Sequence, residues 1–66
     1  MELREFIKFL RGIKGFQSRH FGDEIHLITS VNEDRIGFKY PTGRRGWYTP
    51  IRMWNEAVNG DIKWVY

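Results

Sequence analysis

The stretch Arg35-Ile-Gly-Phe-Lys-Tyr-Pro-Thr-Gly-Arg-Arg-Gly-Trp-Tyr-Thr49 predicts a β-hairpin around which the rest of the chain is arranged. Ile36, Phe38 and Tyr40 alternate with polar residues or glycine, and this period of two is typical of a half-buried strand. The run Pro41-Thr42-Gly43 fits a type I turn closed by a bulge, because proline fixes φ and glycine adopts the left-handed conformation.

This turn sets the register of the hairpin, with Lys39 opposite Arg45 and Gly37 opposite Trp47. The predicted inner face carries Ile36, Phe38, Tyr40 and Tyr48, and the outer face carries Arg35, Lys39, Arg45 and Trp47. Like charges directly opposite each other destabilise a sheet, so Lys39 beside Arg45 favours an anionic partner. The alternative is that both side chains simply extend into water.

The composition indicates one small globular domain that covers residues 1–66. Aromatic residues make up 17% of the chain, which explains how so short a sequence builds a core. The absence of cysteine excludes disulfides and thiolate metal sites and is compatible with a cytoplasmic location.

No apolar run approaches the roughly 20 residues of a membrane span, and the N-terminus lacks the pattern of a signal peptide, so no membrane partner is expected. The net charge of +3 weakly favours anionic partners.

Two amphipathic helices are predicted. The first runs from Glu2 to about Gly12, and its outer side carries a secondary basic stripe of Arg4, Lys8 and Arg11. The second opens at Thr49-Pro50, where threonine caps and proline fits the first helical position. Its predicted buried stripe consists of Ile51, Trp54, Ala57 and Val58.

The remaining segments predict strands and one connector. Residues Lys14–Asp23 are expected to connect the first helix to a strand at Glu24–Val31, with Phe16 and Phe21 under the core. In that strand Ile25, Leu27, Thr29 and Val31 are expected to face the core, with Val31 opposite Ile36, Thr29 opposite Phe38 and Leu27 opposite Tyr40. Ile62–Tyr66 predicts a last strand. The expected fold is therefore α+β: an N-terminal helix, a three-stranded antiparallel β-meander, a second helix and a short C-terminal strand.

This order of elements resembles the double-stranded-RNA-binding-like fold, which HicA-type toxins also use. Gly15-Phe16 after the first helix is similar to those toxins. Where they carry a Gly-Ser-His run with the catalytic histidine, this chain has Gln17-Ser18-Arg19-His20-Phe21-Gly22. No residue role is therefore transferred, and the resemblance assigns no family.

The chain offers little that points to catalysis. His20, Asp23, Glu24 and His26 are metal-ligand residue types, but their spacing matches no metal signature, so neither a metal nor a cofactor is expected. No nucleophile with a partner base and no glycine-rich phosphate loop is present. We expect no enzyme, and replacement of His20 and His26 by alanine should leave any activity intact. A histidine nuclease is the alternative.

Arg35, Lys39, Arg44, Arg45 and Trp47 are the candidate nucleic-acid-binding residues, because cations meet phosphates while an indole stacks on a base. The expected function is a small non-enzymatic binding module that recognises an anionic surface, with nucleic acid as the first choice. The plainer interpretation is an exposed sheet face on which Trp47 shields Gly37. The alternative function is a protein-interaction protein, such as a phage-type inhibitor that docks on a host nucleic-acid machine. Salt separates the two, because phosphate binding weakens steeply as salt rises.

Overall fold

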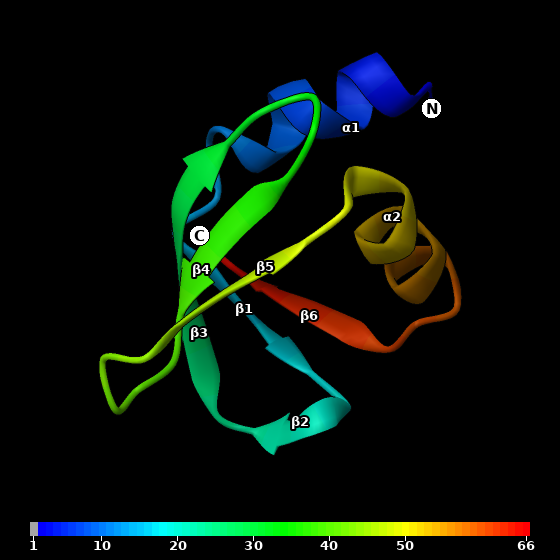
Figure 1. Cartoon of the computed structure of the whole chain (residues 1–66). Helices are drawn as coiled ribbons and strands as arrows, with labels where there is room; N and C mark the ends of the chain where they lie inside the picture. Colours follow the sequence, from blue (N-terminus) through cyan, green and yellow to red (C-terminus); the bar gives the residue numbers. More distant parts are fainter. Residues whose placement is uncertain (1) are drawn as a thin grey trace.

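A computed structural model describes residues 2–66, with the side chain of Asp23 outside the described part. The elements in chain order are α1 (Leu3–Leu10), β1 (Gly15–Ser18), β2 (His20–Asp23), β3 (Ile25–Val31), β4 (Ile36–Lys39), β5 (Arg45–Tyr48), α2 (Pro50–Val58) and β6 (Ile62–Val65). The predicted α+β fold is confirmed: an N-terminal helix, a meander formed by β3, β4 and β5, a second helix and a C-terminal strand (Figure 1).

The sheet is larger than the meander. Five antiparallel strands pair in the order β5-β4-β3-β1-β6. The prediction of a connector at Lys14–Asp23 was wrong, because Gly15–Ser18 forms β1 and His20–Asp23 forms β2. Strand β1 bonds β3 on one side and β6 on the other, so it joins the C-terminal strand to the meander. Phe16 lies in the core as expected, with Phe21 packed against it.

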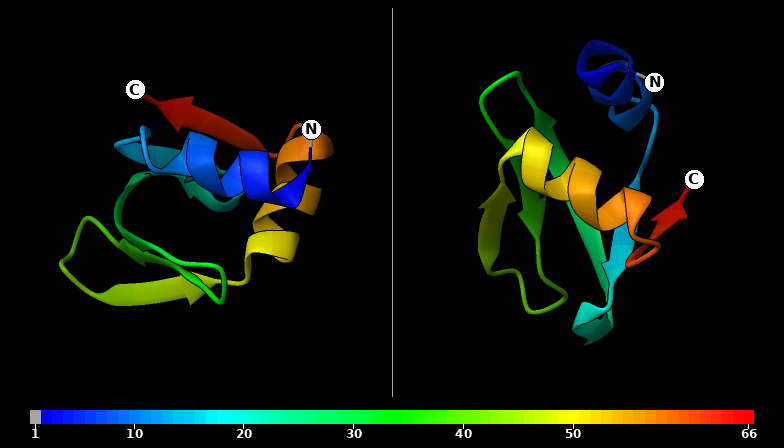
Figure 2. Two further views of the ribbon diagram at one scale, coloured as in Figure 1. Left: turned by 90° about the horizontal axis from the view of Figure 1, so that it is seen from above. Right: turned by 90° about the vertical axis from the view of Figure 1, so that its right-hand side faces the viewer.

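The sheet is strongly bent, so that its concave side encloses the core. Helix α2 lies across the open side between β5 and β6, and α1 covers one end (Figures 1 and 2). The buried core cluster consists of Phe6, Leu10, Phe16, Ile36, Phe38, Tyr48, Met53 and Ile62. The convex side of the sheet therefore faces outward, and the predicted binding residues of the hairpin lie on that side or at its ends.

The hairpin forms in the predicted register. Lys39 pairs with Arg45, Gly37 with Trp47 and Ile36 with Tyr48. Gly43 has φ of +91°, the left-handed conformation that the turn requires. The N–H of Tyr40 donates to the carbonyl of Arg44 at 2.7 Å and closes the loop.

Strand β3 differs from the prediction because it contains a bulge. Val31 pairs with Ile36 as expected, but the register shifts between Ile28 and Ser30. As a result Ile28, not Thr29, lies opposite Phe38, and Leu27 lies opposite Lys39 rather than Tyr40. One extra residue turns the following side chains to the other side of a strand. Ile25 and Leu27 are therefore exposed, while His26 is buried.

Helix α2 begins where the sequence predicts, but it is rotated about its own axis relative to the prediction, so that a different side faces the core. Its N-cap Thr49 accepts a hydrogen bond from the Arg52 N–H through Oγ1, at 3.3 Å. The buried residues are Pro50, Met53 and Glu56. Ile51 and Val58 were expected in the core but are exposed, and Trp54 and Ala57 are only partly buried. The rotation follows from Glu56, because hydrogen-bond donors on β1 and β5 hold its carboxylate inside.

Candidate nucleic-acid interface

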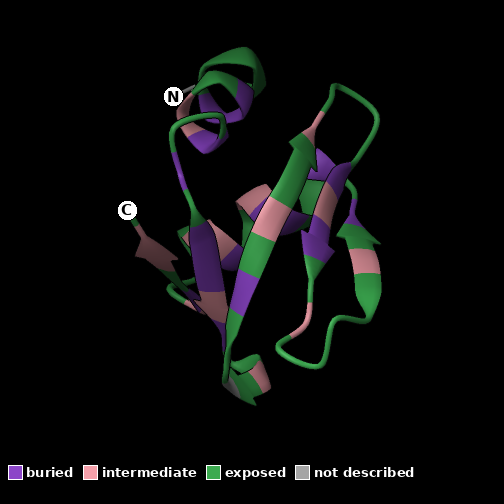
Figure 3. Cartoon of the chain, turned by 90° about the vertical axis from the view of Figure 1, so that its left-hand side faces the viewer, coloured by how far each residue is buried: buried purple, intermediate pink, exposed green. Residues whose placement is uncertain are grey.

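A row of direct cross-strand partners crosses the outer face of the sheet. From β6 to β5 it consists of Val65, Gly15, Leu27, Lys39 and Arg45. Directly opposed residues point to the same side of a sheet, so these side chains share one face. Lys39 and Arg45 are exposed at one end of the row, and Leu27 is 52% exposed at its centre. No described helix lies over this face of β3 and β4 (Figure 3).

The cations of the hairpin have no acidic partners among the described side chains. Lys39, Arg44 and Arg45 form no ion pair there. In contrast, Arg52 on α2 lies 3.2 Å from Glu56 Oε2, and Arg19 lies 3.5 Å from Asp61 Oδ1. The positive charge of the hairpin is therefore free for an external anion, whereas that of Arg19 and Arg52 is partly balanced.

Trp47 and Arg35 form a stacked pair at the end of the same face. The guanidinium carbon of Arg35 lies 5.2 Å from the centroid of the indole, which is a cation–π distance. Trp47 remains 57% exposed. A base can take the place of the guanidinium on the ring if Arg35 moves aside to a phosphate. Trp47 thus offers a stacking surface, and Arg35 offers a cation that can leave the ring when a base stacks on it.

The backbone of Gly37 lies close to the side chains of the bulge in β3. A Cβ at this position would lie 2.5 Å from Ser30 Oγ and 3.1 Å from Thr29 Oγ1. The bulged residues of β3 therefore lean over the backbone of Gly37 from one side, while Trp47 pairs with it from the other. A bare glycine backbone keeps this end of the face flat.

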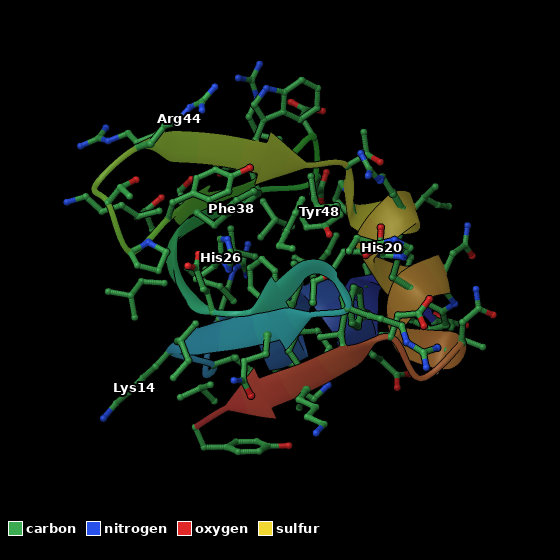
Figure 4. The ribbon with its side chains drawn as sticks, turned by 90° about the horizontal axis from the view of Figure 1, so that it is seen from below. Lys14, His20, His26, Phe38, Arg44 and Tyr48 are labelled. Carbon is green, nitrogen blue, oxygen red and sulfur yellow. The ribbon has the colours of Figure 1, made fainter. Side chains whose placement is uncertain are left out.

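Arg44 lies at the tip of the hairpin, just before β5, and its side chain points away from the body of the protein (Figure 4). It extends the positive charge of Lys39 and Arg45 beyond the edge of the sheet. The structure thus brings together Lys39, Arg44 and Arg45 at one end of the hairpin and Arg35 with Trp47 at the other.

The secondary basic stripe on α1 is separate from this face. Arg4, Lys8 and Arg11 are exposed, and they line a shallow depression together with Ile7, Glu5 and Glu33. The acidic residues lie among the basic ones there, with Glu33 contributed by the loop between β3 and β4. The stripe is therefore less uniformly positive than the hairpin.

The structure also shows a polar cluster that sequence reasoning missed. The carboxylate of Glu56 is buried and accepts hydrogen bonds from Tyr48 Oη at 2.8 Å, Ser18 Oγ at 3.3 Å and Arg52 Nε at 3.2 Å. These residues come from β5, β1 and α2, so the carboxylate ties the helix to the edge strand β5 and to β1, which lies next to the opposite edge. The spacing of Arg52 and Glu56 was the only sequence signal, and an i,i+4 pair on a helix is common on surfaces.

The two histidines lie apart in different surroundings. Nε2 of His20 lies 3.5 Å from Asp61 Oδ2 and 4.0 Å from Glu56 Oε1, beside α2. His26 points into the core, stacked on Phe16 (Figure 4). Its Nδ1 lies 3.0 Å from the Glu24 carbonyl oxygen, and its Nε2 has no hydrogen-bond partner. The metal-ligand residue types of this segment therefore do not converge on one point, and Asp23 lies outside the described side chains.

Among the described side chains, which leave out that of Asp23, no group of three or more His, Cys, Asp or Glu is placed to hold a metal ion. Among the described helices, none combines the length and the apolar character that crossing a membrane requires. No protein-family model, curated protein or solved structure matches the chain. The assignment of function therefore depends on the geometry of the outer face.

Proposed function

We propose that this chain is a small non-enzymatic module of the cytoplasm that binds nucleic acid through Arg35, Lys39, Arg44, Arg45 and Trp47. The observation that carries the proposal is the direct cross-strand pair of Lys39 and Arg45, two cations without a carboxylate partner among the described side chains. Like charges so placed destabilise the hairpin until an anion lies between them. A phosphate between Lys39 and Arg45 removes that repulsion and releases counterions.

The proposal is tested by titration of a fluorescently labelled oligonucleotide at several salt concentrations between about 50 and 200 mM. We expect Arg45→Ala to weaken binding to all sequences about equally and to reduce the salt dependence by about one phosphate contact. We expect Trp47→Ala to lose about 1–3 kcal/mol of binding with the salt dependence unchanged, because stacking releases no counterions.

Arg4→Ala is the matched control, since it removes the same charge from the stripe on α1. It should change binding much less than Arg45→Ala, because Arg4 is not on the outer face. Equal losses in the two variants would mean that net charge, and not the hairpin, attracts the ligand. Absence of binding by the parent protein at low salt would contradict the proposal.

Docking on a protein is the second candidate function, and one apolar groove favours it. The groove has a volume of about 280 Å³ and is lined by Phe6, Phe9, Trp54, Ala57, Val58 and Trp64. Partly exposed tryptophans beside an exposed valine suit a protein interface. A partner that stays bound after nuclease treatment and at high salt, and is lost on Val58→Lys, would support this function.

A further inference from the structure

The outer face carries exposed aliphatic side chains between its cations. Ile25 is 45% exposed and Leu27 is 52% exposed, and both belong to the central strand β3. A second cross-strand row, next to the first, consists of Lys63, Gln17 and Ile25. Cations therefore flank the two aliphatic residues on both sides, with Lys39 and Arg45 toward β5 and Lys63 on β6.

No carboxylate occupies an outward position of the five paired strands. Those positions hold Gly15, Gln17, Ile25, Leu27, Ser30, Gly37, Lys39, Arg45, Trp47, Lys63 and Val65. All the charged side chains at these positions are positive, and Ile25 and Leu27 add exposed apolar surface between them. Such a face complements a ligand that offers both phosphates and apolar surface. Charge and apolar contact together restrict the form of nucleic acid that fits.

A duplex cannot contact the whole of this face in one groove. The major groove of B-DNA is about 12 Å wide and admits a two-stranded ribbon. Five strands spaced by about 4.8 Å extend over roughly 19 Å, so the whole face cannot enter a groove. On the outside of a duplex the face meets phosphates and sugars alone, and the aliphatic side chains Ile25 and Leu27 gain no apolar contact there.

We infer that the preferred ligand is a single strand of nucleic acid that crosses the sheet from β5 toward β6, an inference that rests on the proposed function. In a single strand the flat faces of the bases are accessible. They lie on Trp47, Leu27 and Ile25, while the phosphates contact Arg45 and Lys39 at one end and Lys63 at the other. The ribose hydroxyl plays no part in these contacts, so DNA and RNA strands share the chemistry that the face recognises.

The test compares four labelled ligands of one sequence, about 16 nucleotides long: single-stranded DNA, single-stranded RNA and the two corresponding duplexes. Each single strand should bind roughly tenfold more tightly than its duplex, the equivalent of about one stacked base. A duplex that binds as tightly as its single strand overturns this inference and leaves the proposed function standing. Failure of all four ligands to bind at low salt overturns both.

A pair of variants tests the aliphatic contacts. Leu27→Ser should weaken single-strand binding roughly fivefold without a change in the salt dependence, because apolar contact involves no counterions. Ile51→Ser is the control, since Ile51 is an exposed aliphatic residue on α2, away from the outer face and outside the apolar groove. Melting followed by circular dichroism checks that both variants fold. Unchanged binding by folded Leu27→Ser, or an equal loss in both variants, overturns the inference.

Discussion

The phenol of Tyr48 donates a hydrogen bond of 2.8 Å to Oε1 of Glu56, and both residues are buried. This contact links the last strand of the hairpin to the helix that follows it. A buried carboxylate is stable only when its oxygens are hydrogen-bonded, and here β1, β5 and α2 each supply a donor. The same contact that fixes α2 therefore also holds the hairpin against the core.

The first prediction concerns this contact. Tyr48→Phe should lower the free energy of unfolding by about 1.5–3 kcal/mol, the usual value of a hydrogen bond to a charged group. Glu56→Ala should cost more, about 3–5 kcal/mol, because it leaves two buried hydroxyls without an acceptor. Denaturant unfolding measures both. Glu5→Ala on the exposed side of α1 is the control and should change stability by less than about 0.5 kcal/mol.

The second prediction concerns alkaline pH. Burial, together with the Glu56 carboxylate, raises the pKa of Tyr48 from 10.0 to about 12. Between these values the folded state holds the phenolic proton while the unfolded state loses it, so the free energy of unfolding should fall as pH rises. The slope should approach about 1.4 kcal/mol per pH unit. Below pH 10 the contribution of this group is complete.

Tyr48→Phe isolates this effect, because all other titrating groups are common to both proteins. The stability difference between the parent and the variant should shrink as pH rises from 10 toward 12. A difference that stays constant over this range would show that Tyr48 ionises equally in the folded and unfolded states.

The third prediction tests the rotation of α2. Met53 is fully buried, so Met53→Ala should cost about 2–5 kcal/mol. Val58 is 71% exposed, so Val58→Ala should stay within about 0.5 kcal/mol of the parent. Thermal or denaturant unfolding measures both. If the costs of the two variants were reversed, the helix would face the core with its Ile51 and Val58 side.

The fourth prediction concerns His26, whose Nε2 is buried without a partner. His26→Leu should leave the free energy of unfolding within about 1 kcal/mol of the parent or raise it, because it removes an unsatisfied polar atom of the core. Phe38→Ala in the same aromatic cluster should cost about 3–5 kcal/mol and serves as the control. A loss above about 2 kcal/mol in His26→Leu would indicate that Nε2 bonds an internal water.

Local signals in the sequence determined the hairpin and the ends of α2. Pro41 and Gly43 fix the turn through their own backbone preferences. The geometry of the turn then determines which residues of β4 and β5 lie opposite each other. Thr49 and Pro50 likewise fix the start of α2. The placement of Lys39 beside Arg45 therefore followed from the sequence, because it depends on a few neighbouring residues.

The tertiary structure alone decided which sides of β3 and α2 face the core. The bulge near Thr29 reverses the alternation of β3, so that Leu27 joins the outer face and His26 enters the core. The side of α2 that carries Glu56 faces the core, because the hydrogen-bond donors of this carboxylate, Ser18 and Tyr48, lie on β1 and β5. Hydrophobic periodicity records the average preference of a segment for burial, whereas a bulge and a buried carboxylate depend on partners remote in sequence. The outer face, with its aliphatic centre and basic ends, exists because those remote partners turned Ile25 and Leu27 toward solvent.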